Sequence, residues 1–501
     1  MQGDPSVEGL APLRLDEPHA VSPRRIVTNL GNSVISLIGA MGLGFIVSWL
    51  LARSMGDTVY GQYVFLLGIA GILTSFADLG LSQVMIREVA RDRANAGRHA
   101  VSLISIRMIA NGFVLVASLF LVQLDEAQRS HEVLALVVIV TMMITLLSDL
   151  IRSAFNGFER LELDLVTRIG ERLITLIFIV LLVAGGITLD LAVAGMFAGA
   201  VIGLIITVIT VLRWTPIHPL QFRRHELPIV LKAGLPIGLS IMVVSFYSRY
   251  DVLVLGVLRT SSEVAWFSVA YSLILVLVSL SFAASNTLFP VLSRLAHTGN
   301  MTEHAALFRL MLRYTLVGGL WAAGITFVMA VPFINLLYGP TYSPSAIALE
   351  ILSIALIFIF PTHLMINMLF SLGRQKSVLA SHVLSGIMLL FMDPILISLW
   401  GIQGAAVSNV IIEATIFCLM LVLITRSSGR VAAGTFLRPF AAAGIGAAVY
   451  AVLSIPDLPR ALAAFSVFAL ALFVFKAMTY HDLHRLVLAI SGKMGHSPNA
   501  V

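Results

Sequence analysis

Long apolar segments, separated by short polar connections, run through almost the whole chain. Fourteen such segments are apparent, at residues 28–51, 60–80, 101–122, 133–155, 166–186, 190–212, 232–258, 264–290, 306–331, 346–371, 377–400, 403–425, 433–455 and 459–480. A helix needs about 20 residues to cross a bilayer, and each segment is long enough. The pattern therefore predicts an all-α polytopic membrane protein. It excludes an outer-membrane barrel, whose strands alternate apolar and polar residues over roughly ten positions.

Composition supports this fold class. Hydrophobic residues make up 58% of the chain and charged residues 12%, whereas soluble domains have roughly 45–50% and 25%. The single cysteine, Cys418, lies in an apolar run, which indicates neither a disulfide framework nor a thiolate metal site. The first 26 residues are polar and contain four prolines. They lack the apolar core and cleavage site of a signal peptide, so we expect a flexible cytoplasmic tail.

Basic residues mark one side of the membrane. If the N-terminus is cytoplasmic, 26 basic residues fall in cytoplasmic tails, loops and loop-flanking helix ends. The opposite side holds only Arg53, Arg129, Arg259 and Arg460. Cytoplasmic loops carry such an excess, so both termini are predicted to be cytoplasmic. This topology also explains the net charge of +6, and no nucleic-acid partner is expected.

The chain also contains a faint internal repeat. IREVAR at 86–91, after the second predicted helix, resembles LSRLAH at 292–297, after the eighth, at a shift of 206 residues. The sixth and twelfth helices end in the similar stretches VIT and LIT at a shift of 215. Parallel repeats are one transporter architecture, so we predict two six-helix lobes followed by two further helices. The predicted boundaries are a tail at 1–27, lobes at 28–212 and 232–425, an inter-lobe cytoplasmic loop at 213–231, the two extra helices at 433–480 and a tail at 481–501.

Two charges interrupt the apolar stretch VVSFYSRYDVLVLGVL at 243–258. They are Arg249 and Asp251, and a charge at a helix centre costs roughly 2.5–3.5 kcal/mol on insertion scales. Two residues turn a helix by about 200°, so the two side chains cannot face one point. We interpret Arg249 as an anion contact in a central cavity and Asp251 as a partner of another helix. The alternative is a structural ion pair, or an arginine that extends to the outer interface.

Other polar residues within the apolar segments are weaker candidates. Glu413 lies near the midplane and could couple transport to a proton. His363 is similarly deep and could titrate, or could be a packing histidine. Arg107 could guide an anion inward or extend to the interface, and Asp78, beside a basic loop, could form a local salt bridge or share in ion coupling.

Sequence signatures of enzymes are missing. The chain has no Walker motif, no HExxH, no CxxC pair and no nucleophile elbow. The predicted loops leave no room for a soluble catalytic domain. These features indicate a secondary transporter or flippase, with no cofactor and no metal site.

Two stretches then suggest a family. LLARSMGDTVYGQYVFLLGIAGILTSFADLGLSQVMIREVAR at 50–91 resembles the opening of the Wzx-type polysaccharide-biosynthesis flippases. YSRYDVLVLGVLRTSSEVAWFSVAYSL at 247–273 is similar to their seventh and eighth helices. The glycine-tyrosine that usually follows the loop valine is replaced here by Ala265-Trp266-Phe267.

Two later stretches match further patterns of this family. They are LLYGPTYSPSAIALEIL at 336–352 and GIQGAAVSNVIIEA at 401–414, so the resemblance covers about residues 28–430. It implies the multidrug/oligosaccharidyl-lipid/polysaccharide superfamily, with two six-helix lobes around a central cavity and alternating access. The implied substrate is an oligosaccharide repeat unit on undecaprenyl diphosphate, moved across the bacterial inner membrane.

The resemblance also implies residues and partners. Cavity arginines carry the anion in relatives; Arg249 matches on motif position, and Arg53 is a candidate at the outer mouth. A polysaccharide polymerase and a chain-length regulator are the protein partners it suggests, beside the lipid bilayer and the lipid-linked oligosaccharide.

Four other functions stay open at this point. The two terminal helices suit a lipid II flippase, although the first predicted helix carries no arginine cluster. A drug or cation antiporter would favour acidic residues in the cavity. A membrane glycosyltransferase or polymerase would need a long outer loop, which the predicted topology does not contain. A structural scaffold would leave Arg249 and Glu413 without a role.

Overall fold

The structure of the chain is a computed structural model. It describes residues 23–123, 132–215, 248–428, 434–453 and 457–475, and the single residues 238, 242, 245, 246 and 432. Within this part of the chain the regular secondary structure is helical, without strands. Ten of these helices are long and apolar enough to cross a membrane. The predicted all-α, polytopic fold class is therefore confirmed.

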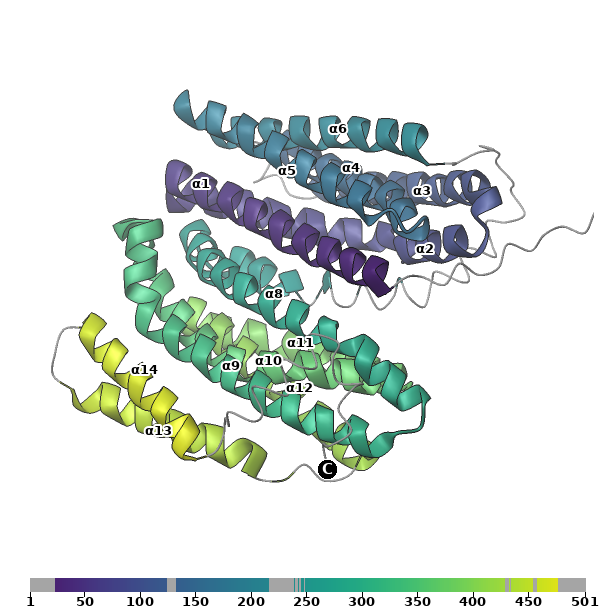
Figure 1. Ribbon diagram of the computed structural model, residues 1–501. Helices are drawn as coiled ribbons and strands as arrows, with labels where there is room; N and C mark the ends of the chain where they lie inside the picture. Colours follow the sequence, from purple (N-terminus) through teal and green to yellow (C-terminus); the bar gives the residue numbers. More distant parts are fainter. Residues whose placement is uncertain are drawn as a thin grey trace, which may run out of the picture.

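The helices of the first half pack together in the upper part of Figure 1. They are α1 (Pro23–Asp78), α2 (Leu81–Arg91), α3 (Ala96–Gln123), α4 (Glu132–Gly157), α5 (Leu161–Ala184) and α6 (Leu189–Trp214), with a 3-10 turn, η1 (Arg93–Asn95), before α3. Glycines let α5 and α6 approach closely. A Cβ built on Gly199 of α6 would lie 2.2 Å from Thr175 Oγ1 of α5, so no larger residue fits.

The predicted segments 28–51 and 60–80 are the two arms of α1. They join at Gly56, whose φ of 75° and ψ of 172° are not helical. Glycine adopts this conformation without the steric cost that a side chain would add. The chain therefore reverses through one glycine rather than through an extended loop.

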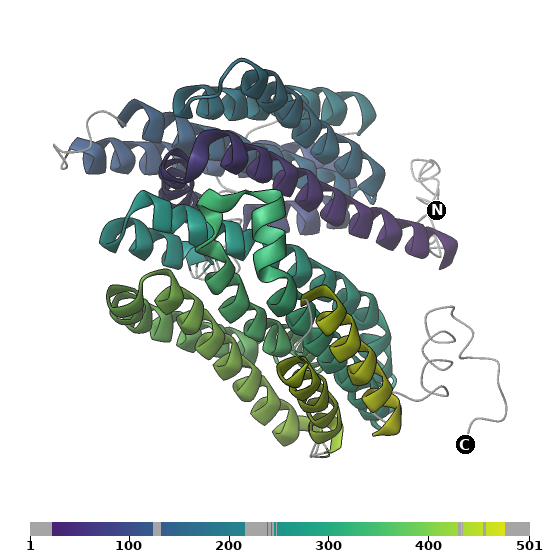
Figure 2. The ribbon, with the colours of Figure 1, turned by 90° about the vertical axis from the view of Figure 1, so that its left-hand side faces the viewer.

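The helices of the second half lie in the lower part of Figure 1, and the turned view of Figure 2 keeps the same two layers. Segment 248–258 is helical and leads into α8. The other elements are α8 (Ser261–His297), α9 (Met301–Leu337), the 3-10 turn η4 (Pro340–Tyr342), α10 (Ser345–Ser371), α11 (Gln375–Trp400), α12 (Ile402–Ser428), α13 (Gly434–Val452) and α14 (Asp457–Val474). The last two pack on each other, and α13 also packs on α9.

The two layers meet along α1 and α8. Leu51 of α1, Ala265 of α8 and Leu349 of α10 are fully buried in one apolar cluster. Most of the predicted inter-lobe loop 213–231 and all of the tail 481–501 lie outside the described residues. The exact lobe boundaries therefore stay a prediction.

The connection between the predicted segments 60–80 and 101–122 contains a short amphipathic helix, α2. Its apolar residues Leu81, Val84, Met85 and Val89 are buried, while Arg87 is exposed to solvent. This helix packs beneath α3 and α4, and it thereby closes the base of the first layer.

Candidate functional site

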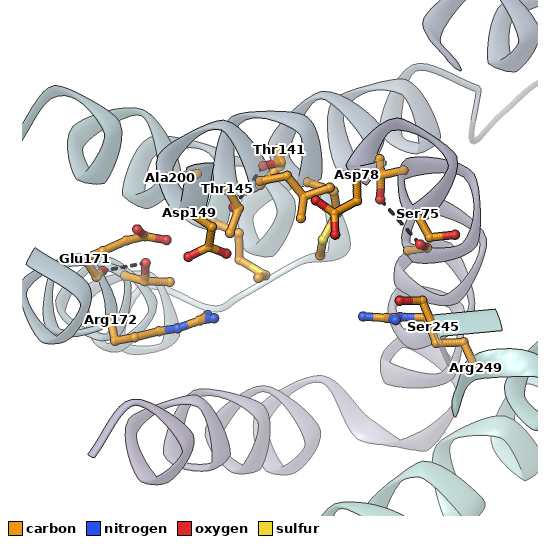
Figure 3. A pocket seen from close by; sticks show the side chains of 16 residues that line it. Ser75, Asp78, Thr141, Thr145, Asp149, Glu171, Arg172, Ala200, Ser245 and Arg249 are labelled. Atoms are coloured by element: carbon orange, nitrogen blue, oxygen red, sulfur yellow. Dashed lines mark hydrogen bonds between the residues drawn. The ribbon is translucent and has the colours of Figure 1, made fainter. Parts of the chain in front are cut away.

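A cavity of about 290 Å³ lies among α1, α4, α5, α6 and the residues before α8 (Figure 3). Its lining residues are Gly71, Thr74, Ser75, Asp78, Thr141, Met142, Thr145, Leu146, Asp149, Glu171, Arg172, Thr175, Met196, Ala200, Ser245 and Arg249. Charged and hydroxyl side chains are frequent in this list, although the surrounding helices are strongly apolar. The cavity is therefore a polar site inside the helical bundle.

Two arginines enter the cavity from opposite sides. Arg172 comes from α5 and Arg249 from segment 248–258, and Figure 3 shows their guanidinium groups pointing toward each other. Arg249 lies directly on Gly71 of α1, because a Cβ built there would be 2.3 Å from Arg249 Nε. Both side chains are half-buried. Neither forms a hydrogen bond or ion pair with another described residue.

The acidic side chains of the cavity are each held by an arginine behind the wall. Arg107 Nη2 lies 2.5 Å from Asp78 Oδ1. Arg152 is buried and bonds Glu171 Oε2 at 2.6 Å and Asp149 Oδ1 at 3.0 Å. These short, charge-assisted contacts neutralise the carboxylates locally.

Arg168 of α5 extends this network. Its Nη1 lies 3.0 Å from Asp149 Oδ1 and its Nη2 lies 3.1 Å from Asp164 Oδ1. The carboxylate of Asp149 thus accepts from two arginines at once. Arg172 and Arg249 form no described hydrogen bond or ion pair with these carboxylates, although Arg172 lies within electrostatic reach of Asp149; their guanidinium groups can therefore offer donors to an anion in the cavity.

Asp251 faces away from the cavity, as the helical spacing from Arg249 predicts. It is 4% exposed, and Asn409 Nδ2 of α12 donates to its Oδ2 at 3.3 Å. The carboxyl group of Asp393, on α11 and fully buried, lies next to it, and neither oxygen of Asp393 has a hydrogen-bond partner among the described residues. The two buried carboxyl groups form a candidate proton-binding site at the α11 and α12 face of segment 248–258.

Two further sequence candidates lie elsewhere in the second layer. Glu413 of α12 is half-buried. It interacts electrostatically with Tyr271, which also interacts electrostatically with Arg249. His363 of α10 places Nδ1 3.1 Å from Ser281 Oγ. It does not line the described cavity.

Arg53 and Arg107 also lie outside the cavity lining. Arg53 donates through Nη1 to the carbonyl oxygens of Leu336 and Leu337, at 3.1 and 2.8 Å. Arg107 is fully buried and bonds Ala77 O at 2.8 Å in addition to its ion pair. Of the predicted site residues, the structure thus brings Arg249 and Asp78 together around one cavity and distributes the others over the molecule.

Sequence reasoning missed Arg172 and the partner of Asp251. Arg172 was counted with the basic flank of a cytoplasmic loop. The signal was available, since Arg168, Glu171 and Arg172 place three charges within two turns of the predicted segment 166–186, which is otherwise without charge. Asp393 precedes Pro394 in the sequence, a pair that indicates a helix kink, and its proximity to Asp251 joins residues too distant in sequence to be seen from spacing.

The sequence pattern of the polysaccharide biosynthesis protein family matches residues 26–296. The chain belongs to this family. A similar protein is the probable low-salt glycan biosynthesis flippase Agl15 of Haloferax volcanii, 22% identical over 388 residues that cover 75% of this chain and 78% of the relative.

Solved structures share the fold of this family member. The lipid II flippase MurJ, in an inward closed conformation, has a TM-score of 0.71 at 14% identity and covers 90% of this chain and 98% of its own. An inward-facing MATE family multidrug transporter has a TM-score of 0.60 at 16% identity, and the match covers 81% of this chain and 97% of the transporter. A MOP superfamily transporter from Pyrococcus furiosus has a TM-score of 0.57 at 14% identity, and the match covers 80% of this chain and 95% of the transporter. The glycan relative and the solved structures that share this fold are flippases and transporters rather than enzymes, and the protein is a multi-pass membrane protein.

Proposed function

We propose that this protein is a flippase that moves undecaprenyl-diphosphate-linked oligosaccharide repeat units across the bacterial inner membrane by alternating access. The observation that carries the proposal is the charge arrangement of the cavity. Asp78, Asp149 and Glu171 are each paired with an arginine, while Arg172 and Arg249 face the interior. Such a cavity favours an anionic headgroup.

Guanidinium groups suit a diphosphate. Each presents several N–H donors in a planar fork that matches phosphate oxygens. Two forks on opposite walls can contact the two phosphates of one diphosphate. A volume of about 290 Å³ is at the small end of ligand pockets, roughly 300–1,000 Å³. It therefore suits the headgroup and the first part of the glycan, with the prenyl chain in the lipid.

The same arrangement argues against a drug or cation antiporter. A cationic substrate needs a carboxylate that is available for pairing, and the described carboxylates of the lining already bind arginine. The name of the Haloferax volcanii relative points to glycan flipping. The Pyrococcus furiosus transporter was itself described as having a binding pocket of reverse polarity and a different function. Pocket polarity thus distinguishes functions on this fold.

A second candidate function is a lipid II flippase. The MurJ fold covers nearly all of this chain, and α13 and α14 supply two helices beyond the two six-helix lobes. The headgroup chemistry is the same for both substrates, because lipid II also carries a diphosphate. The two functions therefore share the arginine site and differ in the glycan.

Two sources of energy fit the site. The membrane potential contributes roughly 2.3 kcal/mol per elementary charge for each 100 mV, and it favours outward movement of an anion. Proton exchange at Asp251 and Asp393 could return the empty carrier, with Glu413 and His363 as the other coupling candidates. In this scheme both termini are cytoplasmic, and a polymerase and a chain-length regulator use the flipped substrate outside.

Complementation tests the proposal. A strain that lacks its own repeat-unit flippase receives the wild type, Arg172→Ala, Arg249→Ala, Arg249→Lys or Arg294→Ala, with surface polymer measured at equal protein levels. We expect the wild type and Arg294→Ala to restore polymer, because Arg294 is exposed on α8 outside the cavity. Each cavity variant should lose at least about ten-fold, as expected for one charged contact worth roughly 1.5–3 kcal/mol. Arg249→Lys should retain part of the activity.

The outcomes separate the candidate functions. Full activity of Arg172→Ala and Arg249→Ala would refute the anion site. A wild type that fails here but supports growth of a strain depleted of its lipid II flippase would assign the second function instead.

A further inference from the structure

Arg53 joins the two layers of the molecule. It lies on α1 just before the kink at Gly56, and its guanidinium donates to Leu336 O and Leu337 O, the last carbonyls of α9. Trp49 Nε1 donates to the same Leu337 O at 2.7 Å. Cations are favourable at helix C-termini, where carbonyls lack partners and the helix dipole is negative.

Further contacts close the same end of the molecule, which the charge pattern predicts to be the outer end. Tyr342 donates its hydroxyl to Ala52 O at 2.8 Å. The hydroxyl oxygens of Thr58 and Ser262 lie 3.0 Å apart. We call this set of contacts the outer seam; it comprises Trp49, Ala52, Arg53 and Thr58 on α1 with Ser262, Leu336, Leu337 and Tyr342. An alternating-access carrier must separate this seam to open outward.

The internal repeat provides a second copy of the same arginine. Arg259 follows Arg53 by 206 residues, the shift that also relates IREVAR to LSRLAH. It makes the same kind of bond, with Nε and Nη2 donating to Ile397 O at 3.0 and 2.8 Å and Nη2 to Ser398 O at 2.7 Å. Its acceptor helix, α11, belongs to its own half. Arg53 instead bonds across the seam.

The counterpart of α11 in the first half is α5. Gly186 follows α5 and Gly401 follows α11; they are 215 residues apart, and each precedes an isoleucine. Both have positive φ, 86° and 58°. The acceptors of Arg259 therefore correspond, at the same shift, to the carbonyls of Leu182 and Val183 at the end of α5.

The parallel course of α1 and α5 points to the end of α5 as the nearest equivalent acceptor in the first half. A Cβ built on Gly39 of α1 would be 3.2 Å from Ile169 Cδ1 of α5. The first arm of α1 and α5 are the first and fifth spans, which are predicted to cross in the same direction. Fourteen residues further along each helix stand Arg53 and Val183, at the same level of the bundle.

We propose that Arg53 alternates between two helix ends: Leu336 and Leu337 of α9 when the outer seam is closed, and Leu182 and Val183 of α5 when it is open. The inference rests on the proposed function only in assuming that the outer end opens. Each state gives the cation carbonyl acceptors, so neither state leaves it unsatisfied. Exchange between equivalent acceptors keeps the two states close in free energy, as a carrier that visits both requires.

Disulfide formation across the seam tests the proposal. The full-length protein in membranes carries Thr58→Cys and Ser262→Cys with Cys418→Ser, which removes the single native cysteine. Gly185→Asp then adds a carboxylate beside the second acceptor set. Gly185 is exposed and its φ is −93°, so a side chain is tolerated. We expect Gly185→Asp to lower the cross-linking rate about two- to five-fold, the effect of a charge at a helix end, and Gly185→Asn to lower it less.

The control is the same substitution without the arginine. In an Arg53→Ala background, Gly185→Asp should have no further effect on the rate. Leu336→Asp, at an exposed residue of the first acceptor set, should raise the rate when Arg53 is present. An unchanged rate in Gly185→Asp, or an equal change without Arg53, would overturn the proposal. The readout is a distance rather than transport, so a failure of the flippase proposal would show separately, in the complementation assay.

Discussion

Arg249 and Asp251 are two residues apart and end in different surroundings. The helical period predicts that they point in different directions, and the structure places one in the cavity and the other against α11 and α12. What the period could not supply was the identity of the partners. Asp393 and Asn409 contact Asp251 from 142 and 158 residues away, and only the tertiary fold brings such residues together.

Arg107 and Asp78 show how one pair can decide between a structural and a transport role. Arg107→Met should destabilise the protein, because removing one partner of a buried ion pair costs about 3–5 kcal/mol. The double variant Arg107→Met/Asp78→Asn removes both charges and should recover most of the melting temperature and of the surface polymer. If the double variant recovers its melting temperature but produces no surface polymer, Arg107 has a role in anion transport as well as in stability. Melting in detergent, followed by fluorescence, measures the first quantity.

At the scale of elements, hydrophobic patterning predicted nearly every described helix. One departure has a physical cause. α1 merges two predicted segments, because Gly56 reverses the chain in a single residue. α5 corresponds to the predicted segment 166–186, although Arg168, Glu171 and Arg172 in its first half lower its apolar signal. The cavity itself was predictable only as a place where charges gather.

The α5 and α6 contact can be tested with one methyl group. A Cβ at Gly203 would lie 2.5 Å from Glu171 Cγ, so Gly203→Ala should push Glu171 away from Arg152. We expect a lower melting temperature and reduced polymer. Gly170→Ala on α5 is the matched control, since its Cβ meets nothing within 4 Å. Glycine to alanine in such an open helical site should stabilise by about 0.4–1 kcal/mol. Equal effects of the two substitutions would show that the close contact has no role.

At the scale of the whole molecule, two sites of opposite character share segment 248–258. Arg249 faces the cavity of the first layer, the proposed anion site, and Asp251 lies beside Asp393 in the second. A movement of this segment would therefore act on both sites together. This arrangement is a physical route by which binding of a proton could be coupled to movement of the headgroup, without contact between the two ligands.

Proton coupling through the carboxyl pair makes a final prediction. A gradient of one pH unit is worth about 1.4 kcal/mol per proton, or about a ten-fold change in accumulation. In proteoliposomes, transport of a lipid-linked oligosaccharide by the wild type should respond to an imposed gradient by up to this factor. Asp251→Asn and Asp393→Asn should abolish the response, while potential-driven transport persists because Arg172 and Arg249 remain. Glu413→Gln and His363→Gln test the other coupling candidates in the same assay. If Glu413→Gln or His363→Gln loses the response to the gradient and both aspartate variants keep it, the proton binds at Glu413 or His363. The carboxyl pair then only anchors segment 248–258 to α11 and α12.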